Sequence, residues 1–264
     1  SSRDLFVLNG QLVEDVKIKL FLAELRSTFE VPPLEVETEN NFPTGCGLAS
    51  SASGFAALIT AIDQALGLNL DIPTRSSWAR RGSGSAARSI VGGFGILQDN
   101  GADWTAQQLL EPREWPLKIV IGVTTHEKKS IGSTEGMERS RLTSPFFTSW
   151  VKSTENDFDA ALKAVSDRNF EALTRIAETS CLKLHALMLS SEPGLIYWSG
   201  ATVDGLHRIR GLRESGVPVF FTVDAGPQIK AICLPTHLKQ VKEAIADLPG
   251  VKDVLVAGLG DGAR

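Results

Sequence analysis

Residues 43–53, with the sequence PTGCGLASSAS, make a glycine- and serine-rich loop that leads into an alanine- and leucine-rich segment. Glycines let the backbone turn sharply and approach a ligand closely, and serines offer hydroxyl groups. The helix that follows presents unpaired N–H groups and the positive end of its dipole. This combination predicts an anion site suited to phosphate. The alternative is a loop that only caps the helix. The pattern is not a P-loop, because no Gly-Lys-Ser/Thr sequence ends it.

The residues on either side of this loop predict a mixed helix and strand segment. Residues 5–13 predict two short strands around Asn9-Gly10, a strong hairpin signal. Residues 14–29 predict an amphipathic helix whose apolar face carries Val16, Leu20, Ala23 and Leu25. Residues 34–38 predict a half-exposed strand. After the loop, residues 50–66 predict a long helix closed by Gly67.

The rest of the chain continues this alternation. Residues 76–90 predict a second helix, and a hairpin follows around Asn100-Gly101. The composition changes near residues 114–116, after which we expect strands at 117–125, 217–223, 229–234 and 251–257 and helices within 133–190, 200–215 and 236–247. The sequence therefore predicts an α+β protein with two domains, residues 1–115 and 116–264. The second would be a sheet with helices on one face.

Composition and charge restrict the classes of partner. The chain has 264 residues, with 27 Lys and Arg against 31 Asp and Glu, a formal net charge of −4. No global positive field would attract a nucleic acid or an acidic membrane surface, so we expect neither. No apolar run approaches the roughly 20 residues of a membrane span. The cysteines, Cys46, Cys181 and Cys233, lie far apart, which argues against a disulfide framework and favours a reducing compartment.

Residues 79–89, ARRGSGSAARS, are the second candidate binding segment. Small hydroxyl residues between Arg80, Arg81 and Arg88 suit an oxyanion ligand, because guanidinium grips carboxylate or phosphate through two parallel hydrogen bonds. The alternative is a basic helix face paired with glutamates. Two glycines inside a helix cost about 1 kcal/mol each relative to alanine, which favours a functional reason for them.

Three further groups of residues could carry chemistry. Asp224 ends a buried strand and precedes Ala-Gly-Pro, although an aspartate in such a turn often bonds only its own backbone. Lys128-Lys129 and Ser133 precede a helix and predict an N-cap or a further anion contact. The four histidines lack metal-ligand spacing and no cysteine lies near a histidine in sequence, so we expect neither a metal centre nor a thiol mechanism.

The order of these motifs resembles that of the diphosphomevalonate decarboxylases, a branch of the GHMP kinase superfamily. The matching segments are NNFPTGCGLASSASGFAAL (40–58), ARRGSGSAARS (79–89), STEGM (133–137) and DAGP (224–227), and they span most of the chain. The resemblance implies the GHMP-kinase fold, in which an N-terminal ribosomal-protein-like α/β domain binds ATP. A C-terminal ferredoxin-like domain follows, and the active site lies in the cleft between them. It also implies a cytoplasmic homodimer.

The resemblance implies an ATP- and Mg2+-dependent reaction on a phosphorylated small molecule. ATP phosphorylates the tertiary hydroxyl of mevalonate 5-diphosphate, and loss of that phosphate with CO2 gives isopentenyl diphosphate, a step of isoprenoid biosynthesis. The implied catalytic residues are Asp224, which activates or orients the hydroxyl, and Arg88. The implied binding residues are Gly47, Leu48, Ser50 and Ser51 for ATP, and Ser83, Ser85, Arg88 and Ser133 for the substrate. The magnesium ligands stay open.

The anionic ligands need a concentration of positive charge that the net acidic composition does not provide globally. We expect it from Arg80, Arg81, Arg88, Lys128 and Lys129, with Arg88 as the cation that keeps Asp224 ionised. An alternative function is decarboxylation of mevalonate 5-phosphate, or phosphorylation of the tertiary hydroxyl as in a mevalonate 3-kinase. A third is a non-catalytic binding fragment.

Three departures from the family pattern qualify the resemblance. Gln228 stands after DAGP where the family usually has Asn, and Ala87 replaces a common Cys or Ser. The family also opens with a lysine- and tyrosine-containing segment that holds substrate and nucleotide, and nothing like it precedes Ser1. We therefore expect that the chain begins partway through its first domain.

Overall fold

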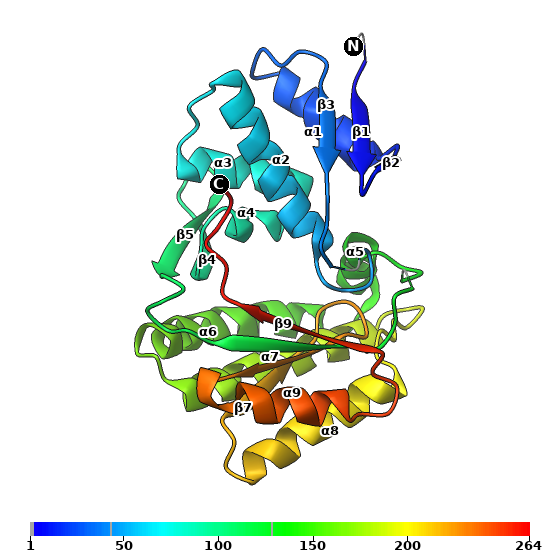
Figure 1. Cartoon of the computed structure of the whole chain (residues 1–264), viewed down its shortest axis with the longest axis vertical. Helices are drawn as coiled ribbons and strands as arrows, with labels where there is room; N and C mark the ends of the chain where they lie inside the picture. The colour runs from blue at the N-terminus through cyan, green and yellow to red at the C-terminus, as the bar shows by residue number, and fades with distance from the viewer. Residues whose placement is uncertain (1–2, 43, 128) are drawn as a thin grey trace. The chain divides into compact units, whose positions relative to one another are not determined.

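The computed structural model describes residues 3–42, 44–127 and 129–264, so Pro43 and Lys128 lie outside the described residues. The contacts within the chain divide it into two units (Figure 1). The N-terminal unit comprises Ser1–Thr44, Ala49–Glu111 and Gly260–Arg264, and the C-terminal unit comprises Gly45–Leu48 and Pro112–Leu259. Each unit has its own hydrophobic core and is described separately.

The N-terminal unit begins with a three-stranded sheet of order β2-β1-β3. Strand β1 (Leu5–Leu8) pairs antiparallel with β2 (Gln11–Leu12), and helix α1 (Val16–Arg26) returns the chain to β3 (Glu35–Thr38), which is parallel to β1. Asn9 and Gly10 have φ of 50° and 74°, as a two-residue type I′ hairpin requires. The predicted hairpin, helix and strand are confirmed.

Of the apolar face predicted for helix α1, Leu25 is buried as expected, but Val16, Leu20 and Ala23 are exposed. Phe21, Leu22 and Leu25 are buried, whereas Val16 and Leu20 are 70% and 65% exposed. The ring of Phe21 lies edge-on to Phe55, with centroids 5.4 Å apart. The aromatic residue therefore determines which face of the helix turns inward, because it removes more apolar surface from water than Val16 would.

The long helix of this unit has the predicted limits. Helix α2 (Ser50–Leu66) ends at Gly67, whose φ of 63° gives the left-handed conformation common at helix C-termini. Its first turn follows Ala49, with φ of 55°, and no side chain caps it among the described residues. Phe55 and Ile59 of α2 contribute to the hydrophobic core.

The single helix predicted over residues 76–90 is wrong, because the segment forms two helices. Helix α3 (Ile72–Gly82) stops where Ser83 becomes extended, and the short α4 (Ala86–Ser89) follows. A Cβ atom added to Gly82 would lie only 2.0 Å from Cδ1 of Phe55. Gly82 is therefore a packing residue between α3 and α2, and its cost in helix propensity does not require a ligand.

A hairpin and the last residues of the chain complete this unit. Strands β4 (Phe94–Asp99) and β5 (Trp104–Leu110) pair antiparallel around Gly101, with φ of 87°, so the predicted hairpin is confirmed. The segment Gly260–Arg264 joins the same unit. The carbonyl oxygen of Gly260 accepts a hydrogen bond from the N–H of Gly93 at 2.8 Å. The N–H of Ala263 donates one to the carbonyl oxygen of Ser89 at 3.1 Å.

The C-terminal unit is built on a four-stranded antiparallel sheet of order β7-β8-β6-β9. The strands are β6 (Lys118–Val123), β7 (Val219–Thr222), β8 (Ile229–Cys233) and β9 (Asp253–Gly258). All four predicted strands are confirmed. The first and third strands of the unit, β6 and β8, are the two central strands of the sheet. The expected ferredoxin-like fold has this strand order.

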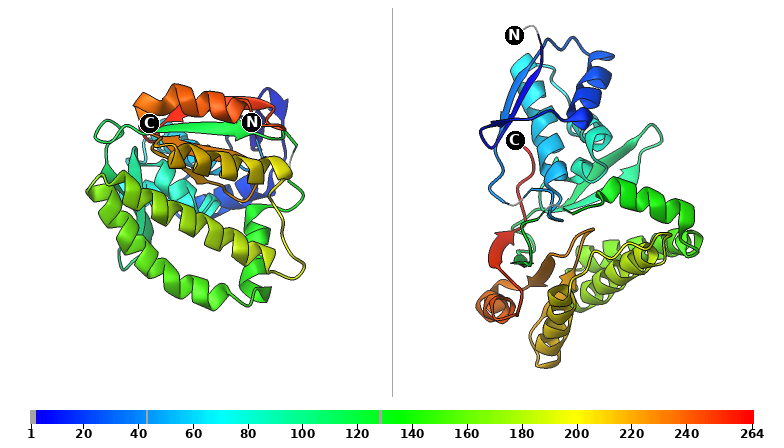
Figure 2. Two further views of the ribbon diagram at one scale, coloured as in Figure 1. Left: turned by 90° about the horizontal axis from the view of Figure 1, so that it is seen from below. Right: turned by 90° about the vertical axis from the view of Figure 1, so that its right-hand side faces the viewer.

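In the described part of this unit, the sheet is accompanied by the helices α5 (Ser133–Thr143), α6 (Phe147–Ser166), α7 (Phe170–Leu189), α8 (Gly200–Glu214) and α9 (Leu238–Ala246) and by the 3-10 turn η1 (Pro235–His237). Helices α8 and α9 lie on the same face of the sheet (Figure 2). Ile209 of α8 and Ile245 of α9 are fully buried in one core with Ile229 of β8. Helix α7 instead lies along the β7 edge, which the prediction of helices on one face did not include.

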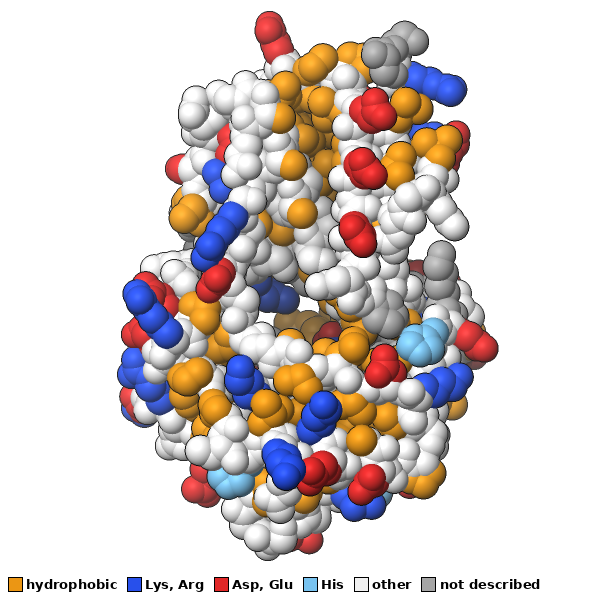
Figure 3. Space-filling model, viewed as in Figure 1, with side chains coloured by type: hydrophobic (Ala, Val, Ile, Leu, Met, Phe, Trp, Pro, Cys, Tyr) orange, Lys and Arg blue, Asp and Glu red, His pale blue; other side chains and the backbone are white. Residues whose placement is uncertain are grey.

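The composition gave expectations about membrane spans, surface charge and cysteine pairing, and the structure agrees with them. No helix in the described part of the chain has the length and apolar character to cross a membrane. Basic and acidic side chains are interspersed on the face shown in Figure 3, without a continuous basic patch. Cys46, Cys181 and Cys233 are all buried and free, which confirms that they form no disulfide.

Replacement of Gly82 by alanine should destabilise the protein by about 1–3 kcal/mol, because the new methyl group would overlap the Phe55 ring. Gly84→Ala is the matched control, since a Cβ at Gly84 meets no atom within 4 Å. Urea unfolding of the two variants measures the difference. Equal stability of the two would contradict the assignment of Gly82 to packing.

Asp103 generates a second prediction, for stability in acid. Its carboxylate accepts hydrogen bonds from Ser77, from Arg80 at 2.8 Å and from the N–H of Trp104 at 2.7 Å, and these partners lower its pKa from 3.8 to about 2. The stabilisation is therefore fully present above about pH 4 and is lost as the pH falls toward 2.

Asp103→Asn should therefore lower the free energy of unfolding at pH 7 by about 1–2 kcal/mol and flatten its dependence on pH between 4 and 2. Urea titrations across this range measure both effects. Asp99→Asn is the control, because Asp99 accepts from the backbone of Gly101 and has no ion pair among the described residues. If the free energy of unfolding of Asp103→Asn falls between pH 4 and 2 as steeply as that of the parent, the assignment is refuted.

Candidate functional site

The glycine-rich segment Gly45–Leu48 is held by its carbonyl groups. Within the C-terminal unit, Gly45 accepts from the N–H of Lys129 at 3.4 Å, and Cys46 accepts from Nε2 of Gln228 at 3.1 Å. The carbonyl of Gly47 accepts from Nζ of Lys230 at 3.4 Å. Because three consecutive carbonyls have partners, the orientation of the peptide groups in this loop is fixed.

Gly47 also makes the closest contact between two backbone segments of the site. A Cβ atom on Gly47 would lie 2.9 Å from Cα of Gly226, and one on Gly226 would lie 2.6 Å from Cα of Gly47. Gly47 in addition has φ of 97°, which side chains rarely tolerate. The PTGCGL loop and the DAGP loop, which the sequence presented as separate motifs, therefore touch through two glycines.

Asp224 lies at the end of strand β7, in a turn closed by a hydrogen bond from the N–H of Gly226 to its carbonyl at 2.7 Å. Its carboxylate is 52% exposed and forms an ion pair with Lys230, with Nζ 2.5 Å from Oδ2. The side chain of Lys230 is only 14% exposed. The carboxylate is thus accessible to a ligand while its charge is balanced from the protein side.

Lys230 is a site residue that sequence reasoning missed. Arg88 was the predicted cation for Asp224, and that pairing stays a prediction, whereas within the C-terminal unit the partner is Lys230. A signal was available in the two predicted strands. Their pairing as a hairpin around DAGP sets Lys230 opposite Thr222, two residues before Asp224.

Lys129 and Ser133 form a second polar group in the C-terminal unit. Nζ of Lys129 donates to Oγ of Ser133 at 2.6 Å and to the carbonyl of Ala225 at 2.7 Å. Ser133 is the first residue of helix α5, which has Gly132 at its N-cap and no side-chain cap among the described residues. A cation beside an uncapped helix N-terminus suits an anion. The ammonium group of Lys129 therefore also connects this cluster to the DAGP loop.

Two other residues of this unit have structural roles. The single tyrosine, Tyr197, packs against helix α5, where a Cβ on Gly136 would lie 2.5 Å from its hydroxyl oxygen. Gln228 is buried, accepts from the N–H of Thr124 at 2.7 Å and donates to Thr125 at 2.7 Å. With its bond to Cys46, the glutamine holds the glycine loop to the end of strand β6. Its extra methylene relative to asparagine is accommodated by these three backbone partners.

The N-terminal unit brings two of the predicted serines together. Ser50 and Ser51 are the first residues of helix α2, and Oγ of Ser51 lies 3.1 Å from Oγ of Ser83 at the end of α3. Ser85 precedes helix α4, and its side chain makes no cap hydrogen bond among the described residues. The nucleotide and substrate motifs of this unit therefore share a hydroxyl contact.

The three arginines of the ARRGSGSAARS segment do not form one cationic cluster. Arg80 pairs with Asp103 at 2.8 Å. Arg81 pairs with Glu24 at 2.7 Å and stacks over the ring of Trp78, 4.3 Å from its centroid. Arg88, in contrast, is exposed and has no ion pair within the described part of the chain. Arg80 and Arg81, which were expected to supply charge for the ligand, thus form ion pairs with protein carboxylates, and the role of Arg88 stays a prediction.

The chain matches two family models that together cover most of its length. Residues 1–107 match the model described as "Diphosphomevalonate decarboxylase-like N-terminal domain", and residues 119–255 match "Mevalonate 5-diphosphate decarboxylase C-terminal domain". The two matches correspond to the motifs that carried the resemblance, since each contains two of them.

Among curated proteins, the chain is 35% identical over 246 residues to the diphosphomevalonate decarboxylase of Candida albicans, covering 85% of this chain and 68% of that protein. It is 31% identical over 265 residues to the phosphomevalonate decarboxylase of Haloferax volcanii, covering 98% and 81%. In several other relatives the matched region spans about half of the protein, for example 50% in Aspergillus fumigatus.

Solved structures give the same result. The mevalonate diphosphate decarboxylase from Enterococcus faecalis aligns with a TM-score of 0.89 at 34% identity, over 99% of this chain and 82% of that one. A structure described as "MDDEF in complex with MVAPP, AMPPCP and Magnesium" aligns with a TM-score of 0.91, at the same identity and coverage. The likeness extends from sequence motifs to the path of the backbone. The chain belongs to the diphosphomevalonate decarboxylase family.

Proposed function

We propose that this protein catalyses the ATP-dependent decarboxylation of mevalonate 5-diphosphate to isopentenyl diphosphate, with release of ADP, phosphate and CO2. The observation that carries the proposal is the exposed carboxylate of Asp224, paired with the largely buried side chain of Lys230, on a loop that touches the glycine loop at Gly47. Family membership supports the same reaction.

The proposed role of Asp224 is to accept a hydrogen bond, or the proton, from the tertiary hydroxyl of the substrate. Either task needs a carboxylate oxygen in a fixed position, and the ion pair with Lys230, with Nζ 2.5 Å from Oδ2, holds one oxygen of Asp224 in place. If the transition state of phosphoryl transfer is loose, positioning of the hydroxyl contributes more than proton removal. The exposure of the carboxylate leaves room for this contact.

We assign the substrate carboxylate to Arg88, and its diphosphate to Ser133 with Lys129. An arginine with no carboxylate partner among the described residues suits a bidentate contact with a ligand carboxylate. Lys129 at the N-terminus of α5 supplies positive charge where the diphosphate needs it. Ser83 and Ser85 provide hydroxyl contacts in the N-terminal unit.

ATP would be bound by Gly47, Leu48, Ser50 and Ser51, through N–H groups and the N-terminus of α2. No three His, Cys, Asp or Glu side chains come together as a metal site among the residues described. This fits Mg2+, which commonly keeps waters and binds nucleotide phosphates with few protein ligands. Ser50 and Ser51 are the hydroxyl donors that would hold it. When bound, the ion neutralises charge on the transferred phosphoryl group.

A second candidate is the same reaction on mevalonate 5-phosphate. It is favoured by the similarity to the Haloferax volcanii phosphomevalonate decarboxylase, which covers 98% of this chain. Incubation with ATP, Mg2+ and each substrate in turn distinguishes the two. Faster turnover of the monophosphate would replace the diphosphate in the proposal. Phosphorylation without CO2 release would indicate a 3-kinase-like relative, and binding of neither substrate nor ATP a non-catalytic fragment.

The remaining parts of the proposal concern organisation. We retain residues 1–115 as the ATP-binding domain and 116–264 as the C-terminal domain. A cytoplasmic location is supported by the three buried free thiols, since such cysteines persist in reducing compartments. Homodimer formation is supported by exposed apolar side chains of the C-terminal unit, among them Leu142, Phe146 and Ile196. Sedimentation at several concentrations tests the dimer.

Asp224→Asn should reduce kcat by a factor of about 100 or more, because the amide cannot accept the hydroxyl proton. The Kd for ATP should change less than about threefold, as the side chain is not assigned to the nucleotide. Release of CO2 and calorimetric titration with ATP measure the two quantities. Activity equal to that of the parent would remove Asp224 from the mechanism.

Arg88→Lys should reduce kcat/KM for the phosphorylated substrate by a factor of about 10–100, because lysine cannot make the bidentate contact. The matched control is Arg81→Lys, a residue of the same segment that pairs with Glu24 and is assigned to no ligand. Steady-state kinetics at saturating ATP compare the two variants. Similar values for both would indicate that Arg88 does not bind substrate.

A further inference from the structure

Strand β7 is an edge strand of its sheet, and its free edge is occupied by side chains of helix α7. The sheet order places β8 on one side of β7 only. On the other side, alternate residues direct backbone groups away from the sheet, and such groups normally need a strand or solvent as partner. Here Phe221 and Val223 are fully or almost fully buried, so water cannot serve.

Three residues of α7, spaced as i, i+3 and i+7, supply these partners. The carboxylate of Glu178 accepts from the N–H of Phe221 at 3.2 Å. Sγ of Cys181 accepts from the N–H of Val223 at 3.2 Å, and Nε2 of His185 lies 3.0 Å from the carbonyl oxygen of Val223. This spacing brings the three side chains to one face of the helix. We call them the α7 rail.

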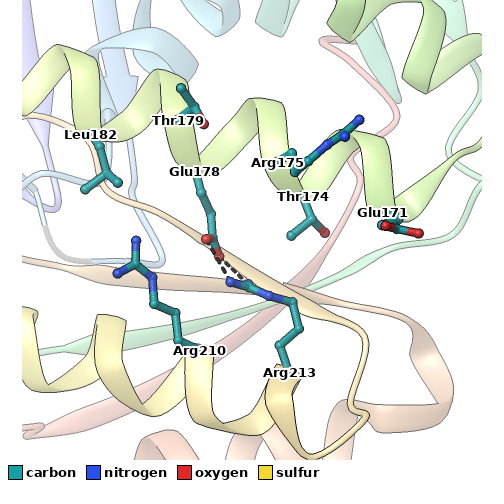
Figure 4. Close-up of a pocket in the computed structure, with 8 residues that line it drawn as sticks. All are labelled: Glu171, Thr174, Arg175, Glu178, Thr179, Leu182, Arg210 and Arg213. Carbon is teal, nitrogen blue, oxygen red and sulfur yellow. Dashed lines mark hydrogen bonds and ion pairs between the residues drawn. The ribbon is translucent and has the colours of Figure 1, made fainter.

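Two members of the α7 rail, Glu178 and His185, have further contacts of their own. Glu178 pairs with Arg213 of α8, at 2.6 Å to one oxygen and 3.1 Å to the other, as Figure 4 shows within a pocket of about 480 Å³. Arg213 also donates to the carbonyl of Val219 at 3.2 Å, which extends the contacts along the same strand. The ring of His185 lies 4.5 Å from that of Trp198, measured between centroids.

The protonation states of His185 and Cys181 agree with the hydrogen bonds that these side chains make. Burial lowers the pKa of His185, so the ring is neutral near pH 7, and its contact with a carbonyl requires the hydrogen on Nε2. Burial raises the pKa of the Cys181 thiol, which therefore stays protonated. Neither group is available as an acid, base or nucleophile toward a ligand, since both are buried.

Val223, whose N–H and carbonyl both contact side chains of α7, immediately precedes Asp224. The last residue of β7 in register with β8 is Thr222, opposite Lys230, so the ladder stops one residue before Val223. Beyond that point the described contacts to the backbone of Val223 come from Cys181 and His185. The direction in which the chain leaves the sheet, and hence the position of the Asp224 carboxylate beside Lys230, depends on these two side chains.

We propose that Cys181 and His185 are positioning residues for Asp224: they fix the backbone of Val223 and so hold the carboxylate at its working position. This inference rests on the proposed role of Asp224 in the reaction. A displacement of reacting groups by about 1 Å costs up to about 100-fold in rate. Loss of either contact should therefore lower kcat, while substrate and ATP binding by other residues continues.

The test uses two pairs of variants. Cys181→Ala and His185→Phe remove a hydrogen bond, whereas Cys181→Ser and His185→Gln retain a polar group that can replace it. Cys181→Ala and His185→Phe should lower kcat by a factor of about 10–100 with KM values within about twofold. Cys181→Ser and His185→Gln should recover most of the loss. If His185→Phe fails to fold, the cysteine pair decides.

Cys233→Ala is the matched control, because it removes a buried thiol from strand β8 that makes no contact with the Val223 backbone in the described residues. It should lower stability while kcat stays within about twofold of the parent. A parent-like kcat in both Cys181→Ala and His185→Phe would overturn the proposal. So would a loss of kcat in Cys233→Ala equal to that in Cys181→Ala, since it would show a general effect of core damage.

Amide hydrogen exchange separates failure of this inference from failure of the proposed function. Exchange of the Val223 amide should be faster by a factor of about 10 or more in Cys181→Ala than in Cys233→Ala, whether or not the parent turns over either substrate. An inactive parent with this exchange difference would contradict the proposed reaction and leave the rail intact. Unchanged exchange at Val223 would overturn the rail itself, whatever the activity.

Discussion

The contact between Gly47 and Gly226 is the constraint on which the rest of the site depends. With 2.6–2.9 Å between each ideal Cβ position and the opposite Cα, no side chain fits at either residue. The two loops can approach this closely only because polar side chains bind the carbonyls beside the contact, as Gln228 does at Cys46 and Lys230 at Gly47. Lys230 then also reaches Asp224, so one ammonium group connects the glycine loop and the candidate catalytic carboxylate.

In the C-terminal unit, the same few side chains cover the free edge of the antiparallel sheet and position a candidate functional residue. The β7 edge would otherwise expose backbone donors and acceptors that could pair with another chain. Helix α7 covers that edge with polar side chains, and the strand leads directly to Asp224. Covering an edge and placing a functional residue are thus accomplished by one set of contacts. The arrangement explains why α7 carries a buried glutamate, cysteine and histidine where an ordinary core helix would carry aliphatic residues.

Local signals in the sequence predicted the elements well, and long-range pairing limited what could be predicted of the site. Helix α2 and its end at Gly67 follow from periodicity and a C-terminal glycine, and the Asn-Gly pairs predicted both hairpins. The break at Gly82 could not be predicted, because it depends on the Phe55 ring from another helix. The partners of Arg80 and Arg81 depend likewise on residues 23 and 57 positions away.

The division of the chain has a consequence for protein engineering. The backbone passes from one unit to the other at residues 44/45, 48/49, 111/112 and 259/260. A gene cut once, between the codons for residues 111 and 112, would therefore yield two polypeptides that each lack a short segment of their own unit. The first would miss the bonds that Gly93 and Ser89 make with the last five residues. The second would miss the loop around Gly47. Co-expression of both halves, rather than either alone, is the route to folded material.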